Sequence, residues 1–229
     1  MKTLVLLSLI ILSSCLTKSS ISQIDSRNDC INSRKFGLVD ICLPEITGMV
    51  EMYSNPIVKE MADFGKYQSN VILGLYLNEK YKSNLDAITF YLDDYFKLYA
   101  LGTIKGQKIS TSFFEEVARN NQAGWDGDMP DIEELEKKLE EKSLSKIDFG
   151  KPLIIDFYRP NPKIFTSINL VNIKMNSEEK KVLCLLSYVH MKNTIICYAY
   201  YRNYKGPKTL EEFKAKSDLF GLKLMEINS

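Results

Sequence analysis

The sequence predicts an α+β protein with an antiparallel sheet, a C-terminal strand meander, and helices packed on one or both faces. Two observations predict this class. Four extended apolar runs follow one another in the second half of the chain, joined by short turn segments, and short links favour antiparallel neighbours. Segments with helical periodicity lie before and after these runs, so strands and helices are grouped rather than strictly alternating.

The first half is expected to begin with strands. Apolar and polar side chains alternate over 37–43, and a second short strand is expected over 46–53, after Pro44. We expect 55–68 to be irregular and polar. Residues 69–81 carry apolar side chains on both faces of an extended chain, which is typical of a strand in the middle of a sheet.

Helices are expected in the middle of the chain. Apolar residues recur at helical spacing over 83–102, where Gly102 is a suitable end. Ser112 followed by Glu115 is a capping-box pattern, which predicts a short helix within 108–122. Two glycines and a proline predict a loop over 123–130. The charged segment that follows predicts a surface helix over 131–146.

The second half predicts four strands, a helix and a short closing segment. The strands are expected to form the meander, and they lie at 152–160, 163–175, 181–190 and 194–204. A final helix is expected over 205–221, because Thr209 with Glu212 is a second capping-box match and Gly221 is a typical C-terminal stop. Residues 222–228 are expected to form a closing strand or an extended tail.

The N-terminus has the features of an export signal, which we assign to 1–14. Lys2 precedes the run LVLLSLIIL, and the small residues Ser13 and Ser14 follow it. The run is too short to span a bilayer, which needs about 20 apolar residues. A buried N-terminal helix is the alternative, and the charged, apolar and small residues in this order favour the signal.

The four residues LSSC at 12–15 resemble the lipobox of bacterial lipoproteins. The resemblance implies cleavage before Cys15 and acylation of its thiol, which places the protein on the cell membrane or the outer membrane. Two or three acyl chains would hold it on a membrane, whereas a single short chain binds only marginally. Ordinary signal cleavage, giving a soluble secreted protein, remains the alternative.

The mature chain is expected to have a tether and one domain. Residues 15–36 comprise the lipidated cysteine and a polar segment without periodicity, and 37–229 are expected to form a single α+β domain. Removal of Lys2 with the signal leaves 29 basic and 29 acidic residues, so the net charge is 29 − 29 = 0. A neutral chain without a lysine or arginine run gives no support for nucleic-acid binding.

Four cysteines remain if Cys15 is acylated, and they allow three pairings. If 181–190 and 194–204 form a hairpin, Cys184 falls opposite residues near 200, which argues against a bridge to Cys197. Buried thiols are the alternative to a bridge for these two cysteines. A Cys30–Cys42 bridge would staple the tether to the first strand, and the sequence leaves this pairing open.

The order of elements is similar to the PsbP/Mog1-like α/β sandwich. The early strand ending DICLP carries this resemblance together with the late strand YAYYRNY and the helix TLEEFKAKSDLF after it. It is a resemblance of topology and not of a motif. It implies a binding or assembly module, because that fold is known mainly for contacts with partners.

Two groups of residues are candidate binding sites. Trp125 stands beside the acidic loop residues Asp126, Asp128 and Asp131, although their spacing does not fit an EF-hand and favours a polar turn before a helix. Tyr198, Tyr200 and Arg202 are of types favoured at interfaces. The interpretation that we favour for these three is that they cover the final helix.

The residues offer no complete catalytic set. His190 is the single histidine and is expected as a partly exposed turn residue, and we find no GxSxG, no glycine-rich phosphate loop and no metal-ligand pattern. We therefore expect no cofactor, no metal and no catalytic residue. The sequence predicts an envelope lipoprotein that binds or assembles with another envelope protein. The alternative is an exported metal-assisted hydrolase that uses Asp126, Asp128 and Asp131.

Overall fold

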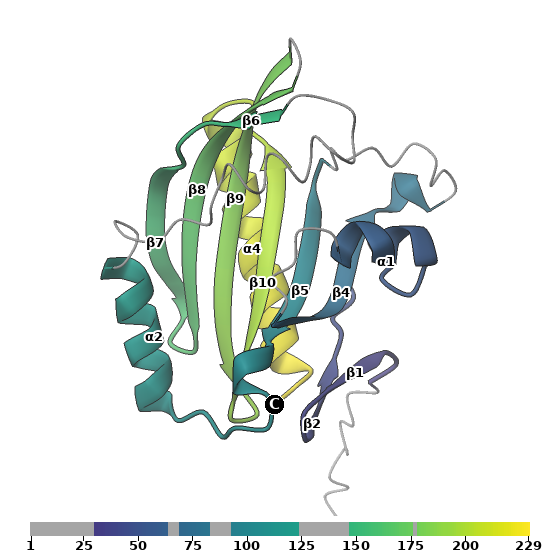
Figure 1. The fold of residues 1–229 in the computed structure, drawn as a ribbon, viewed down its shortest axis with the longest axis vertical. Coiled ribbons are helices and arrows are strands. Elements are labelled where there is room, and N and C mark those ends of the chain that lie inside the picture. Colours follow the sequence, from purple (N-terminus) through teal and green to yellow (C-terminus); the bar gives the residue numbers. More distant parts are fainter. Residues whose placement is uncertain (1–29, 64–68, 83–92, 124–146, 176–177) are drawn as a thin grey trace, which may run out of the picture.

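The computed structural model describes residues 30–63, 69–82, 93–123, 147–175 and 178–229 (Figure 1). Its helices are α1 (Pro56–Asp63), α2 (Thr111–Ala123) and α4 (Pro207–Glu226), with short 3₁₀ helices η1 (Glu79–Tyr81) and η3 (Gly102–Ile104). Its strands are β1 (Ser33–Phe36), β2 (Val39–Cys42), β3 (Met49–Glu51), β4 (Asn70–Asn78), β5 (Tyr95–Leu101), β6 (Ile147–Phe149), β7 (Leu153–Asn161), β8 (Ile164–Met175), β9 (Glu178–Met191) and β10 (Thr194–Asn203).

The described strands form an eight-stranded sheet and a separate hairpin. The order in the large sheet is β3-β4-β5-β10-β9-β8-β6, with β7 also paired to β8, and β1 pairs with β2. Every pair is antiparallel. The α+β class is therefore confirmed. None of the described helices is both long enough and apolar enough to cross a membrane.

The predicted meander is confirmed as β7-β8-β9-β10. Strands β9 and β10 are joined by Lys192 and Asn193, both with positive φ (48° and 54°), so their link is a two-residue hairpin turn with the twist that antiparallel strands favour. The resulting register places Cys184 opposite Tyr201. Cys184 and Cys197 are both free, as the hairpin argument predicts.

Helix α4 packs along one face of the large sheet (Figure 1). Phe96 of β5 stacks on Tyr200 of β10 at 3.9 Å between ring centroids, and on Phe220 of α4 at 4.4 Å. All three rings are fully buried. Because side chains alternate between the two faces of a strand, the neighbouring residues of β5 and β10 point to the opposite face.

That opposite face carries α1 and α2. Lys97 of β5 donates a hydrogen bond from Nζ to the carbonyl oxygen of Ala62 in α1, at 2.7 Å. Tyr188 of β9 donates from its hydroxyl to Asn121 Oδ1 of α2, at 3.0 Å. The sheet therefore lies between α4 on one side and the two shorter helices on the other.

The helix predicted over 83–102 is wrong for its described part, which forms β5. The burial of Tyr95–Leu101 alternates strictly, with Phe96, Leu98 and Ala100 buried against the α4 side. Tyr95 and Tyr99 are four residues apart, a spacing that places side chains on one face of a helix and also on one face of a strand. Residues 83–92 lie outside the described chain, as does the helix predicted over 131–146.

The end predicted for the final helix is also wrong. Helix α4 continues through Gly221 to Glu226, so the closing strand predicted over 222–228 is helical for most of its length. Gly221 is buried, and a Cβ atom built on it would lie 2.7 Å from the hydroxyl oxygen of Tyr198 and 3.2 Å from Ile164 Cδ1. This glycine therefore allows close packing of the helix on the sheet and does not end it.

Helix α1 lies in a segment that was expected to be irregular. Asn55 Oδ1 accepts hydrogen bonds from the backbone amides of Ile57 and Val58, at 3.0 and 3.3 Å. Pro56 occupies the first helical position, where the missing amide hydrogen costs nothing. The Asn-Pro pair was the overlooked sequence signal for this helix.

The two predicted capping boxes use different partners. The amide of Phe113 donates to Ser110 Oγ at 3.2 Å, while Glu115 forms an ion pair with Arg159 at 2.8 Å. Glu212 of the second pattern likewise pairs with Arg202. Both helices begin within the predicted ranges, but their glutamates bind arginines on strands instead of capping.

The N-terminal hairpin is fastened at two places. Cys30 and Cys42 form a disulfide, which decides the pairing that the sequence left open. Asn228 Nδ2 donates to the carbonyl oxygen of Cys42, and the Cys42 amide donates to Asn228 Oδ1, at 2.9 and 2.8 Å. Strand β1 begins at Ser33, which is inside the range assigned to the tether, and 16–29 lie outside the described residues.

We predict that Gly221→Ala lowers the free energy of unfolding by about 1–3 kcal/mol, because the added methyl overpacks the α4–sheet contact. Urea denaturation measures this. Tyr198→Phe removes the nearest clashing atom, so the double variant should lose less stability than the two single variants added together. Contrary evidence would be a gain of about 0.5–1 kcal/mol for Gly221→Ala, the normal effect inside an uncrowded helix.

We also predict how the thiols react with iodoacetamide at pH 8. Burial raises the pKa of the Cys184 thiol to about 12, and burial raises that of Cys197 further. Neither should react in the native protein. Unfolding without reductant should expose these two thiols, and reduction should add the Cys30 and Cys42 pair. Four thiols before reduction would contradict the bridge.

Candidate functional site

The acidic loop proposed from the sequence lies outside the described residues. This applies to Trp125, Asp126, Asp128 and Asp131, and also to Cys15. Within the part of the chain that the structure describes, no group of three or more His, Cys, Asp or Glu residues is placed to hold a metal ion. The described candidates are therefore Tyr198, Tyr200 and Arg202, at the end of β10.

Tyr198 and Tyr200 lie beneath α4 and are fully buried. The Tyr198 hydroxyl donates to the carbonyl oxygen of Ser217 at 3.0 Å, and burial raises the pKa of this phenol to about 12. The Tyr200 ring stacks on Phe213 of α4 at 4.3 Å. Both rings fasten the helix to the sheet, in agreement with the interpretation favoured from the sequence.

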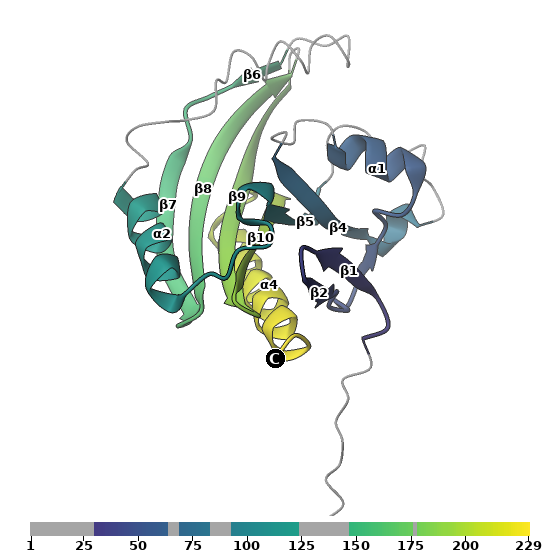
Figure 2. The same ribbon diagram turned by 60° about the horizontal axis from the view of Figure 1, so that its bottom comes forward.

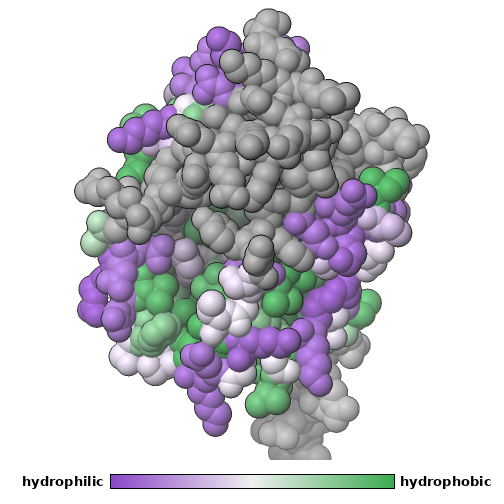
Figure 3. Space-filling view, in the orientation of Figure 1, coloured by the Kyte–Doolittle hydropathy of each residue, from purple (hydrophilic) through white to green (hydrophobic). Residues whose placement is uncertain are grey.

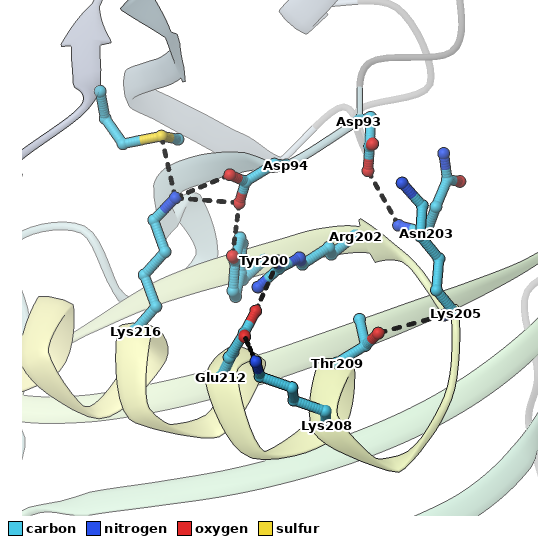
Figure 4. Close-up of polar contacts among 11 residues, drawn as sticks. Asp93, Asp94, Tyr200, Arg202, Asn203, Lys205, Lys208, Thr209, Glu212 and Lys216 are labelled. Atoms are coloured by element: carbon cyan, nitrogen blue, oxygen red, sulfur yellow. Dashed lines mark hydrogen bonds and ion pairs between the residues drawn. The ribbon is translucent and has the colours of Figure 1, made fainter.

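Above these rings, a polar cluster joins the end of β10, the start of α4 and the residues just before β5 (Figure 4). Asp94 is at its centre. Its carboxylate accepts a hydrogen bond from the Tyr200 hydroxyl and binds Lys216 Nζ at 2.8 Å. Burial, followed by the hydrogen bond to Asp94, raises the pKa of Tyr200 above its usual range, so the phenol remains a donor.

The same cluster continues along the surface as a set of ion pairs. Arg202 binds Glu212 at 2.9 Å, and Lys208 approaches the same carboxylate at 3.9 Å. The backbone amide of Asn203 donates to Asp93 Oδ1 at 3.0 Å. Arg202 is therefore committed to an ion pair with the first turns of α4, with its side chain 27% exposed.

An open depression of about 600 Å³ lies beside this cluster, where β9 begins and β10 ends. Its lining is Glu179, Lys180, Lys181, Asn203, Tyr204 and Lys205. Three lysines and one glutamate leave the lining with two excess positive charges, 3 − 1 = 2. Its floor is held by the backbone amide of Tyr204, which donates to the carbonyl oxygen of Lys181 at 2.7 Å. This lysine-lined depression can accept a polar or acidic group of a partner.

His190 is buried, so the expectation of a partly exposed turn residue is wrong. Its Nε2 atom donates to the carbonyl oxygen of Ile109 at 2.9 Å, and its ring stacks on Phe114 of α2 at 5.4 Å. The turn begins two residues later, at Lys192, and the chain leading into α2 covers the imidazole. His190 therefore holds α2 against β9, and its Nε2 proton is committed to that contact.

Asp94 and Lys216 are not among the residues predicted for a site. Asp94 lies in the described part of the range 83–102, which was predicted as a helix and leads into β5, and Lys216 is one of several lysines of α4. Asp94 has a φ of 68°, a left-handed conformation that Asp and Asn tolerate better than most residues. Two aspartates directly before an alternating aromatic run were the available signal for a turn leading into a strand.

We predict that Asp94 and Lys216 are energetically coupled, since their side chains are only 21% and 23% exposed. In a double-mutant cycle with Asp94→Asn and Lys216→Met, urea denaturation should give a coupling of about 0.5–2 kcal/mol. Lys208→Met is the matched control: its side chain is 89% exposed, so its loss should cost less than about 0.5 kcal/mol. Additive effects of the first pair would contradict the central role of Asp94.

No family model matches the sequence, and no curated protein matches it. Two solved structures share 10% sequence identity with it, and each alignment covers 86% of this chain and 90% of the other chain. They are a point mutant of the protein Mog1, at a TM-score of 0.32, and the Saccharomyces cerevisiae Ran-binding protein Mog1p, at 0.28. These values carry no argument about partner or activity.

Proposed function

We propose that this protein is exported, acylated on Cys15, and acts on a cell-envelope membrane as a binding or assembly component without catalysis. The observation that carries the proposal is the sequence LSSC at the end of a short apolar run that follows Lys2. A cysteine directly after small residues at this point is the feature that bacterial lipoproteins share.

The disulfide between Cys30 and Cys42 supports export. Disulfides persist in oxidising compartments outside the cytosol and are rare in proteins that remain inside it. The two cysteines in the large sheet stay free; Cys197 is buried and Cys184 is half-buried. The oxidised pair is therefore the one at the start of the described chain, close to the proposed anchor.

Covalent geometry keeps the domain near the membrane in this proposal. Fifteen peptide steps from Cys15 to Cys30, at no more than about 3.6 Å each, limit the distance between these residues to about 54 Å. The start of the described domain, at Cys30, therefore lies within that distance of the proposed lipid anchor. This range suits contact with another component of the same envelope.

The polar residues of the described domain support a role in binding. Arg202, Asp94 and Lys216 are each committed to an internal ion pair. In contrast, the lysine-lined depression presents exposed ammonium groups at Lys181 and Lys205, beside the aromatic ring of Tyr204. We propose this depression as the contact for an acidic segment of a partner protein.

We predict that Cys15→Ala abolishes incorporation of a labelled fatty acid and releases the protein from the membrane fraction. The acyl chains are the proposed anchor, and each buried methylene contributes about 0.8 kcal/mol to membrane binding. Labelling in cells followed by membrane fractionation measures both effects. Ser14→Ala is the matched control, because a small residue is kept before the cleavage point.

Equal labelling of the wild-type and Cys15→Ala proteins would contradict acylation at this residue. The intact mass of the mature protein distinguishes the alternatives: an N-terminal Cys15 with added acyl mass indicates the lipoprotein, and an unmodified chain indicates the secreted protein. Thiol titration gives an independent result, because an unmodified Cys15 adds one thiol to those of the folded domain.

A further inference from the structure

Three turns meet at the end of the molecule where the described chain begins. The turn between β1 and β2 contacts the loop after η3, because a Cβ atom on Gly37 would lie 2.9 Å from the backbone nitrogen of Gly106. The turn between β9 and β10 contacts β2, since Lys192 Nζ donates to the carbonyl oxygen of Asp40 at 2.8 Å. Figure 2 shows β1 and β2 at the same end as the C-terminus of α4.

The chain before α2 joins the same surface. The amide of Ile109 donates to the carbonyl oxygen of Asn193 at 2.8 Å. These contacts connect three turns and one linking segment that are far apart in the sequence. We call the exposed residues that they bring together the hairpin-end surface, which consists of Lys35, Leu38, Lys105, Lys108 and Lys192.

The composition of the hairpin-end surface is unusual for a surface exposed only to water. Leu38 stands at the tip of the hairpin and is 90% exposed. The other exposed residues of these turns include four lysines and Asp40, which is paired with Lys35 across the hairpin. Lys192 Nζ also donates to Asn228 Oδ1 at 3.1 Å, so Lys35, Lys105 and Lys108 are the lysines assigned to lipid contact. Figure 3 shows hydrophobic side chains beside hydrophilic ones at this lower end.

The hairpin that carries Leu38 is held firmly. The Cys30–Cys42 disulfide closes its base, and Asn228 binds both backbone groups of Cys42. Gly37 takes a φ of 60° at the tip, which a residue with a side chain adopts only under strain. Because this tip is rigid, the backbone that carries Leu38 would lose little conformational freedom when the side chain inserts into a lipid layer.

We infer that the hairpin-end surface lies against an anionic phospholipid bilayer, with Leu38 inserted at the headgroup level and the lysines facing lipid phosphates. This inference rests on the proposed acylation of Cys15. The tether enters the domain at Cys30, which the disulfide joins to Cys42 of this same hairpin, so the chain that leads to the proposed anchor joins the domain at the hairpin. A lysine near an anionic membrane contributes about a fivefold gain in membrane affinity.

The lysine-lined depression then faces away from the membrane. Strand β10 runs from Thr194, at the hairpin end, to Asn203, at the depression. Nine steps of about 3.3 Å separate these ends by about 30 Å. A partner at the depression and a bilayer at the hairpin end therefore do not compete for the same side of the protein.

Quenching by brominated lipids tests this orientation in the mature, full-length protein reconstituted into vesicles that contain phosphatidylglycerol. The only tryptophan is replaced by Trp125→Phe, and a reporter is introduced by Leu38→Trp. We expect strong quenching of the reporter. The matched control is Leu153→Trp at the start of β7. Leu153 is an apolar residue that is 61% exposed, and it lies at the end of the sheet away from the hairpin-end surface. This second reporter should remain unquenched.

Charge reversal tests the lysines with the unacylated Cys15→Ala protein. Lys105→Glu with Lys108→Glu should lower its affinity for phosphatidylglycerol vesicles by about tenfold or more in 50 mM salt. Lys174→Glu with Lys208→Glu makes the same charge change at the far end, outside the lining of the depression, and should leave the affinity unchanged. Neutral phosphatidylcholine vesicles should bind all of these proteins weakly.

The outcomes for the anchor and for the hairpin-end surface are separable. Acyl mass on Cys15 with equal quenching at both reporter positions would overturn the orientation and leave the lipoprotein proposal intact. An unmodified Cys15 with salt-sensitive binding that Lys105→Glu and Lys108→Glu remove would overturn the anchor and retain the surface. Equal effects of the two charge-reversed pairs would overturn the surface in either case.

Discussion

The stack of aromatic rings between α4 and the centre of the sheet is the interaction on which the rest of the structure depends. Phe96 of β5 contacts both Tyr200 of β10 and Phe220 of α4. Strand β5 closes the N-terminal group of strands, and β10 closes the C-terminal meander, so this contact joins the two halves of the chain. The close approach of α4 requires Gly221, because any side chain there would meet Tyr198.

The polar groups at the edge of this stack follow from its geometry. Because the Tyr200 ring is buried in the stack, its hydroxyl lies at the edge of the stack. A buried hydrogen-bond donor at this place needs an acceptor. Asp94 supplies that acceptor and is itself neutralised by Lys216, so one carboxylate connects β5, β10 and α4. These residues are committed to holding the fold, whereas Lys181 and Lys205 of the depression and Lys35, Lys105 and Lys108 of the hairpin end are exposed.

Strand β10 also separates the hairpin-end surface from the lysine-lined depression, and these two surfaces differ in composition. The hairpin end has a protruding leucine among lysines, and it adjoins the disulfide-closed entry of the chain. The depression at the other end of β10 has lysines beside a tyrosine and has no protruding apolar side chain in its lining. The proposed arrangement, with one end at a membrane and the other directed at a partner, uses this separation.

The sequence by itself determined the features that depend on local patterns. The four strands of the meander, the final helix and the position of Cys184 opposite Tyr201 all follow from alternation and from short turns. The helix assigned to 83–102 is wrong over its described part, because a four-residue spacing of tyrosines fits both one face of a helix and one face of a strand. Cys30 and Cys42 could be recognised as a possible pair, but not chosen over other pairings.

Only the tertiary structure decided which distant segments meet. Asp94 and Tyr200 are separated by 106 residues, and no local pattern places β5 beside β10. The burial of His190 depends on Ile109 from a separate segment, and the role of Gly221 depends on a strand that it contacts only after folding. The hairpin-end surface likewise exists because three turns converge, and convergence is set by packing of the whole sheet and not by the residues on either side of each turn.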